Sequence, residues 1–541
     1  MGCGASVDND SDSQASLEEW EKVQRRRRSG ISYLSDEDSD NEAGYQKDLQ
    51  EKSLKATGFQ GSINVVPQDY TLCDHINFSI TVLITLFYYA VGSMRVFLRP
   101  IIKSDVFQQG ASIAIVDEIY PAARDTSLLE TTSGTLFLDN DFPPSETALY
   151  HSKRTRDPQI IWLRPHELTN NPELLVGGVS RHDIVQGILA DCWFLSACSA
   201  VAQIPRLMEK VIPRNQKLSG EGYKGIVTFR FWRFGNWVTV YVDDLLPTRK
   251  RKLIFSKSSE PREFWVSLLE KAYAKLHGSY EALEGGQAMD ALVDLTSGLA
   301  EMYALDSAPP HLYNFLLQAS LNGAFITCSR KGDWRATTRK ADSNGLVSGH
   351  AYTISAVATV KLSTGSDAFL VRIRNPWGID TEWNGKWNDS DSNWHNVDSS
   401  TKQKIEYIKR GDGEFWMSYQ DFCREFEEVT ICSITPDLSQ HSSIKSNPSN
   451  ADGPIPPTTM KCIHGRWKKN KTCGGSRNNL VSYAKNPQFL LTLSPKTSRE
   501  DCNIVIALMQ LRRRCVRHPQ RKMLQIAFVT FKLTLDVTNK N

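Results

Sequence analysis

A cysteine stands where a short turn runs into an apolar helix. Cys192 follows the stretch QGILAD and precedes the apolar run WFLSACSAVAQI. A thiol at a helix N-terminus lies near the positive end of the helix dipole, which stabilises the thiolate, its nucleophilic form. Gln186, six residues upstream across Gly187, can point amide N–H groups at a developing oxyanion, with a backbone N–H as second donor. The alternative is a cysteine of an ordinary core helix, because free cysteines are often buried.

A general base for such a thiol is available further along the chain. His350 stands at the expected start of a strand in GLVSGHAYTISAV, and Asn375 stands at the end of the next strand in FLVRIRNPWG. Asn375 can fix the tautomer of His350, and Trp377 can shield their hydrogen bond from water. Cysteine, histidine and asparagine in this order have the roles found in papain-like thiol proteases. The alternative for His350 is a structural histidine.

The elements around these residues predict a mixed architecture. Residues 226–244 alternate apolar and polar side chains on either side of Gly235, which indicates a hairpin. Residues 261–283 predict an amphipathic helix with proline in its first turn and apolar residues four apart. These apolar residues are Phe264, Leu268, Ala272 and Leu276. Three later runs, AFITCS, HAYTISAV and AFLVRIR, predict strands. The fold class is therefore α+β, with a helical first half and an antiparallel second half.

The bulk composition excludes some functions. The chain has 541 residues and a net charge of only +3, so it is not predicted to bind nucleic acid. Its eleven cysteines lack the spacing of a zinc site, and no cleavable signal peptide stands at the start. We expect reduced cysteines and a cytoplasmic location.

The N-terminal segment carries targeting signals. The first residues, MGCGAS, fit N-myristoylation of Gly2, with Cys3 beside it as a site for palmitoylation. Two acyl chains hold a protein on a membrane where one alone is marginal. Residues 1–60 are otherwise polar, and we expect a disordered acylated tail. Membrane lipids on the cytosolic face are the expected partner.

Residues 61–130 form a poorly defined segment with one apolar stretch. Residues 78–94 contain no charge and reach the lower length limit of a membrane span. Basic residues on both sides of this stretch do not fit a single span. The alternatives are an interfacial segment, a segment packed in a core, or an error in the gene model.

Four stretches in this order resemble the calpain family of cysteine proteases: QGILADCWFL, GLVSGHAYTI, RIRNPWG and DGEFWMSYQDF. The resemblance implies a papain-like catalytic domain over residues 131–433. Its first subdomain, 131–320, holds Cys192, and its second, 321–433, holds His350 and Asn375. A linker over 434–458 and a partial β-sandwich over 459–541 would follow. One departure is Ala190, where calpains usually carry glycine.

The resemblance also implies two bound calcium ions, one in each subdomain, with Trp377 leaving the cleft when the halves close. Arg181 and Glu414 match positions that pair across the two halves. The implied ligands of the first ion are the carbonyls of Val176 and Gly178 with the carboxylates of Asp183 and Glu281. Those of the second ion are Glu382, Asp389, Asp412, Glu414 and the carbonyl of Arg410. All are oxygen donors, as calcium prefers.

The expected function is calcium-dependent limited proteolysis of protein substrates at a membrane. No EF-hand loop is found in the sequence, so a small EF-hand subunit is not expected as a partner. A catalytically inactive membrane scaffold of the same fold is the alternative, although the chain keeps Cys192, His350 and Asn375. A thiol acyltransferase or a transglutaminase would share the cysteine and the histidine, but these enzymes tend to orient the histidine with aspartate.

Overall fold

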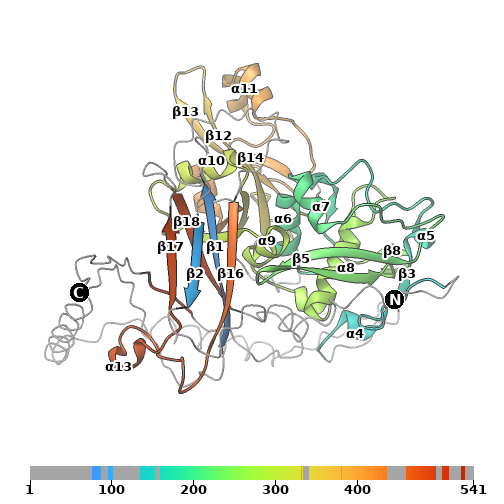
Figure 1. Cartoon of the computed structure of the whole chain (residues 1–541). Helices are drawn as coiled ribbons and strands as arrows, with labels where there is room; N and C mark the ends of the chain where they lie inside the picture. Colours follow the sequence, from blue (N-terminus) through green and yellow to red (C-terminus); the bar gives the residue numbers. More distant parts are fainter. Residues whose placement is uncertain are drawn as a thin grey trace, which may run out of the picture. The chain divides into compact units, whose positions relative to one another are not determined.

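The structure is a computed structural model of the chain, shown in Figure 1. It describes residues 76–86, 95–100, 135–152, 159–330, 332, 340–378, 381–434, 458–494, 502–510 and 526–530. The expected disordered tail and the acylation sites Gly2 and Cys3 lie outside the described residues.

The first part of the region 135–434 is rich in helices packed around one hydrophobic core. Its helices and helical turns are α4 (Glu146–Leu149), α5 (Pro165–Leu168), η3 (Arg181–Asp183), α6 (Cys192–Val201), α7 (Pro205–Val211), α8 (Trp265–His277), η4 (Glu281–Leu283) and α9 (Ala288–Thr296). Its strands are β3 (Ile160–Leu163), β4 (Ile184–Val185), β5 (Ile226–Arg233), β6 (Asn236–Asp243), β7 (Leu246–Arg249), β8 (Lys252–Leu253) and β9 (Lys257–Ser258).

The predicted hairpin and helix are both present. Strands β5 and β6 pair antiparallel through a two-residue turn, Phe234 and Gly235, whose φ angles of 49° and 102° match the twist of a hairpin. Helix α8 begins at Trp265, so Pro261 precedes the helix instead of lying in its first turn. Gly278 ends α8 in a left-handed conformation with φ of 106°.

The second part of the region 135–434 is built on a six-stranded antiparallel sheet with the order β10-β15-β11-β12-β13-β14. These strands are β10 (Leu299–Ala304), β11 (Phe325–Ser329), β12 (Ala351–Lys361), β13 (Asp367–Arg374), β14 (Glu414–Ser418) and β15 (Glu428–Ser433). Helical elements beside it are α10 (Leu312–Leu321), η5 (Ser392–Asn396), α11 (Ser399–Lys404) and α12 (Tyr419–Glu425). The three strands predicted from AFITCS, HAYTISAV and AFLVRIR are β11, β12 and β13. Leu305, Leu312 and Leu316 belong to the second core, so that core begins before the expected boundary at residue 320.

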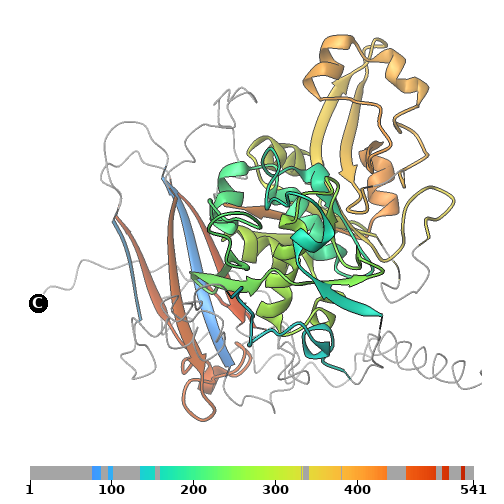
Figure 2. The same ribbon diagram turned by 90° about the vertical axis from the view of Figure 1, so that its right-hand side faces the viewer.

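Strands from both ends of the chain share two further sheets. Strand β1 (Ile76–Leu86) pairs antiparallel with β16 (Thr458–Trp467) on one side and with β18 (Cys502–Gln510) on the other. Figures 1 and 2 both show β1, in blue, between those strands. Strand β2 (Arg95–Pro100) pairs with β17 (Phe489–Ser494). The remaining element is the short helix α13 (Leu480–Tyr483).

The apolar stretch 78–94 is therefore a strand over the part that the structure describes. Residues 78–86 lie in β1, and residues 87–94 fall outside the described ranges. Among the residues that the structure describes, no helix has the length and hydropathy that a membrane span requires. The uncharged run over residues 78–86 therefore forms the central strand of an antiparallel sheet.

Candidate active site

Helix α6 begins at the predicted nucleophile. Cys192 is its first residue and is partly exposed, whereas every following residue through Val201 is buried. The buried body of the helix anchors it in the core, while the thiol remains accessible at the N-terminal end. The helix dipole at that end favours the thiolate over the thiol.

The turn before α6 holds the predicted oxyanion donor in a fixed place. The side-chain Nε2 of Gln186 donates to the carbonyl of Leu189 at 2.7 Å and lies 3.5 Å from Oδ1 of Asp191. A Cβ atom on Gly187 would lie 2.1 Å from the carbonyl oxygen of Phe255, so only glycine fits there. Ala190 is accommodated in this turn, and its carbonyl accepts a hydrogen bond from the backbone N–H of Gly285 at 2.8 Å.

His350 and Asn375 form a buried hydrogen bond. His350 directly precedes β12 and Asn375 directly follows β13, and the distance between Nε2 and Oδ1 is 2.9 Å. Asn375 is fully buried and His350 is 5% exposed. The ring of Trp377 lies 5.1 Å from that of His350, and its backbone N–H donates to Asn375 Oδ1 at 3.0 Å. The indole thus covers the pair, as the sequence predicts.

Packing brings the cysteine helix to the histidine strand. Helix α6 packs against β11 and β12, and the hydroxyl of Thr353 in β12 donates to the carbonyl of Ser196 in α6 at 2.7 Å. The backbone N–H of Gln186 donates to the carbonyl of Pro376, one residue after Asn375, at 3.0 Å. Burial raises the pKa of Tyr352 far above its usual value, and Cys192 contributes to this shift. Three segments that are distant in sequence therefore meet in one place.

The predicted pair across the two halves is formed. Arg181 contacts both carboxylate oxygens of Glu414, at 3.1 and 3.3 Å, in a fork geometry. Burial alone would raise the pKa of Glu414, but Arg372 and Arg181 hold it below its usual value. The pair therefore joins the turn η3 of the first half to β14 of the second half as an ionic link.

The first predicted calcium site contains one acidic residue that the sequence reasoning missed. Glu263 is buried, and its Oε1 accepts a hydrogen bond from the backbone N–H of Val176 at 2.8 Å. Burial raises the pKa of Glu263 to about 7, and the charge of Asp183 adds to the shift. Asp183 in turn accepts from the indole of Trp265, the first residue of α8, at 3.2 Å. Val176, Asp183 and Glu263 thus meet at the N-terminal end of α8.

Glu281 lies beyond the opposite end of the same helix, so the structure does not bring it to Asp183. Helix α8 has 13 residues, which separates its two ends by about 20 Å at 1.5 Å per residue. The carboxylate of Glu281 accepts hydrogen bonds from the backbone N–H groups of His151 and Ser152, both at 2.8 Å, and from the Ser152 hydroxyl at 2.6 Å. Gly178, with φ of 103°, stays in the loop beside Val176.

The second predicted calcium site lies around a small cavity. The cavity has a volume of about 50 Å³, and Asp389, Arg410, Asp412 and Glu414 are among its lining residues. Burial raises the pKa of Asp389 to about 6, with repulsion from Asp412 and Glu414 adding to the shift. Glu382 accepts from the backbone N–H of Gly413 at 2.8 Å, which places it next to Asp412 and Glu414.

Both groups of residues fit a hard cation, although neither is a dense side-chain cluster. In the ranges that the structure describes, no group of three or more histidine, cysteine, aspartate or glutamate side chains is arranged as a metal cluster. Two carboxylates supplemented by backbone carbonyls, as at the partly exposed Asp183 and the buried Glu263, suit calcium without such a cluster. Burial is the main cause of the raised pKa values of Glu263 and Asp389, and neighbouring acids add to each shift.

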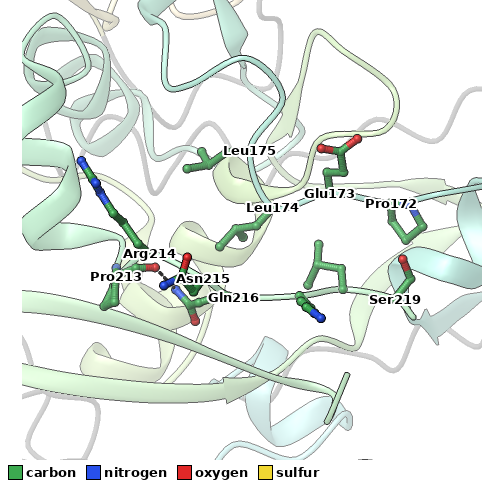
Figure 3. Close-up of a pocket in the computed structure, with 11 residues that line it drawn as sticks. Pro172, Glu173, Leu174, Leu175, Pro213, Arg214, Asn215, Gln216 and Ser219 are labelled. Atoms are coloured by element: carbon green, nitrogen blue, oxygen red, sulfur yellow. Dashed lines mark hydrogen bonds between the residues drawn. The ribbon is translucent and has the colours of Figure 1, made fainter. Parts of the chain in front are cut away.

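A larger pocket lies away from these residues. It has a volume of about 310 Å³ and is lined by residues 172–175 and 213–219 (Figure 3). Neither Cys192, His350 nor Asn375 lines it. The side chain of Gln216 in this lining bonds to nearby backbone: it donates to the carbonyls of Pro213 and Thr228 and accepts from the N–H of Thr228. We assign it no role in the chemistry.

A thiol at a helix start, assembled with a buried histidine–asparagine pair, is the arrangement of papain-like cysteine proteases. Comparison with family models narrows this class. The model described as calpain family cysteine protease matches residues 137–433, and the model described as calpain large subunit, domain III, matches residues 463–541. The chain belongs to the calpain family.

Curated relatives agree with this assignment. The chain is 40% identical to Calpain-B of Drosophila melanogaster over 425 residues, which cover 77% of this chain and 44% of that protein. It is 39% identical to human Calpain-9 over 400 residues, covering 74% and 56%. It is 40% identical to the human Calpain-1 catalytic subunit over 423 residues, covering 75% and 57%. The chain spans about half the length of the curated relatives it matches.

Proposed function

We propose that the chain is a calcium-dependent cysteine endopeptidase that cleaves protein substrates at a limited number of sites. The observation that carries this proposal is the assembly of three separate segments at one place. These segments supply the thiol of Cys192 at the start of α6, the amide of Gln186, and the His350–Asn375 hydrogen bond. Family membership supports the same reaction class.

The reaction follows from the roles of these groups. The Cys192 thiolate attacks the carbonyl carbon of a peptide bond, and the negative charge that develops on the oxygen is stabilised by N–H donors, one of them from Gln186. His350 gives its proton to the leaving amine, and a thioester to Cys192 remains. Water, deprotonated by His350, then attacks the thioester and releases the new carboxylate and the thiol. Asn375 keeps the ring of His350 oriented throughout, and Trp377 limits access of water to their hydrogen bond.

Two calcium ions are part of the proposal. Val176, Gly178, Asp183 and Glu263 would hold one ion, and Glu382, Asp389, Arg410, Asp412 and Glu414 would hold the other. A bound ion would supply positive charge that compensates the buried carboxylates of each half. The Arg181–Glu414 contact then links the first half to acids of the second site. Membrane attachment through acyl chains on Gly2 and Cys3, at the cytosolic face, completes the proposal.

Removal of calcium is expected to stop cleavage reversibly. Without a cation, the buried carboxylates repel one another and the two halves are less favourably assembled, so the rate should fall to background. The measurement is hydrolysis of a fluorogenic peptide by the full chain as calcium is titrated and then chelated. Cleavage that is the same before and after chelation would contradict the calcium part of the proposal and leave the protease part standing.

A matched pair of variants tests the revised first calcium site. Glu263→Gln removes one charge beside Asp183, so the calcium concentration for half-maximal activity should rise at least about tenfold, which corresponds to about 1.4 kcal/mol. Glu281→Gln removes the same charge beyond the other end of α8 and should leave that concentration nearly unchanged. The reverse order of effects would restore Glu281 as the ligand.

A further inference from the structure

A row of polar side chains crosses the six-stranded sheet beside the candidate active site. Thr327 of β11 stands opposite Thr353 of β12, which stands opposite Arg374 of β13. Arg374 in turn stands opposite Glu414 of β14. Residues directly opposite in antiparallel strands have their side chains on the same face, so these four lie on one face of the sheet. Thr327, Thr353 and Arg374 are each at most 1% exposed, so their polar atoms depend on partners within the protein.

Three members of the row contact the first half of the region 135–434. Nε of Arg374 donates to the carbonyl of Arg181 at 3.0 Å, and Glu414 pairs with the Arg181 guanidinium. The Thr353 hydroxyl donates to the carbonyl of Ser196 in α6 at 2.7 Å. This last bond joins the helix that begins at the nucleophile to the strand that follows the histidine.

We propose that Thr353 is a positioning residue that sets the separation and orientation of Cys192 and His350 through its hydrogen bond to α6. This role rests on the proposed cysteine protease function. Ser196 lies four residues after Cys192, about 6 Å along the helix axis, and Thr353 lies three residues after His350, about 10 Å along an extended chain. Sliding of α6 along β12 therefore changes the distance from the thiol to the imidazole, and the hydroxyl opposes such sliding.

Removal of the hydroxyl leaves the helix intact. In an α-helix the carbonyl of Ser196 faces the backbone N–H of Ala200, four residues later, so the Thr353 hydroxyl is a second donor to that carbonyl. A valine at position 353 has nearly the same shape as threonine, and α6 stays anchored by its buried residues. The substitution should therefore loosen the alignment of α6 and β12 without unfolding the chain.

A small misalignment is enough to change the rate. The reacting groups must approach within about 3–3.5 Å, and a displacement of about 1 Å by a mutation away from the chemistry can cost about 100-fold. Binding of a peptide does not depend on the alignment of Cys192 with His350, so the loss should fall on kcat and leave KM nearly unchanged.

Substitutions at two positions in the full chain test this role. Thr353→Val removes the hydroxyl, so kcat should fall about 5- to 50-fold with KM within about twofold of wild type. Thr353→Ser keeps the hydroxyl, and kcat should stay within about threefold of wild type. A further comparison uses Thr353→Ala, which differs from Thr353→Ser only in the hydroxyl and should show the loss. The measurement is steady-state hydrolysis of a fluorogenic peptide at saturating calcium, with thermal melting of each variant as the control for folding.

Thr327→Val is the matched control. Thr327 is the buried neighbour of Thr353 in the row, and in the part of the chain that the structure describes its hydroxyl has no hydrogen-bond partner. The substitution makes the same chemical change one strand away, so kcat should stay within about twofold of wild type. Replacing a buried hydroxyl that lacks a partner should also leave the melting temperature unchanged or raise it.

Alkylation of Cys192 tests the alignment without turnover. A nearby imidazolium keeps a thiol ionised, so iodoacetamide at mildly acidic pH should modify Cys192 at least about threefold more slowly in Thr353→Val than in wild type. Mass spectrometry of the peptide that contains Cys192 gives this rate. An unchanged rate in folded Thr353→Val would overturn the inference, and so would equal losses of kcat in Thr353→Val and Thr327→Val. If the wild type shows no proteolysis, the proposed function fails, and the alkylation rates still decide whether Thr353 aligns the thiol with the imidazole.

Discussion

Replacement of Cys192 by alanine is expected to lower calcium-dependent peptide cleavage by at least about 10³-fold. No other group at the site can replace the thiolate, because His350 is engaged with Asn375 and Gln186 is only a donor. The substitution removes one sulfur from a partly exposed position, so the fold should be retained. The measurement compares fluorogenic peptide hydrolysis by the wild type and the variant at saturating calcium.

Cys423→Ala is the matched control for that experiment. Cys423 on α12 is also a partly exposed free thiol, and burial raises its pKa, so it should be inert. Full activity is expected in this variant. Cleavage that survives in Cys192→Ala would show that another residue is the nucleophile, whereas a folded but inactive wild type would favour the scaffold alternative.

Introducing proline at Val82 is expected to disrupt the sheet formed by β16, β1 and β18. Val82 lies in the central strand, opposite Lys461 of β16 and Ile506 of β18. A central strand has partners on both sides, and proline has no N–H to donate, so one ladder bond is lost and a carbonyl of a neighbouring strand is left without its donor. The cost is about 1–3 kcal/mol from the lost bond alone. Limited proteolysis should then cut within residues 458–510 faster than in wild type.

Val82→Thr provides the comparison for this variant. Threonine keeps the backbone N–H and the β-branched shape, so the cleavage rate within residues 458–510 should stay close to that of the wild type. Peptide hydrolysis in Val82→Pro reports separately on the protease region. Equal protease resistance in the proline and wild-type chains would mean that β1 does not pair as the structure shows.

Sequence patterns within a few residues of each position were enough to predict most of the candidate active site. Cys192 could be placed at a helix start because an apolar run follows it directly, and His350 and Asn375 could be placed at strand ends because each adjoins a regular strand pattern. The hairpin turn at Gly235 follows from a short-range preference for positive φ. Each of these inferences depends on residues within a few positions of one another.

The residues of the first predicted calcium site could not be identified from local sequence patterns. Glu263 and Glu281 flank the same helix, and each is an acid next to an aromatic residue in the sequence. Only the tertiary structure shows which end of α8 faces Asp183, through the indole of Trp265. One signal was available: Glu263 stands two residues before Trp265, at the end of the helix that could approach the loop containing Val176.

The pairing of β1 was also out of reach of pattern reasoning. An uncharged apolar run is compatible with a membrane span, a buried helix or a central strand, and periodicity alone does not separate the last two. The partners of β1 lie in β16 and β18, and nothing in residues 76–86 specifies them. The pairing of strands that are distant in sequence depends on how the intervening chain folds, which local patterns do not show.

That pairing sets an order of events during synthesis. Strand β1 leaves the ribosome more than 370 residues before the first residue of β16. At roughly 5–20 residues per second, it waits roughly 20–75 s for a partner. The protease region, which lies between, can fold completely in that interval. The nascent chain therefore carries a folded domain behind an uncharged 11-residue strand with both edges open, the kind of segment that chaperones protect from aggregation.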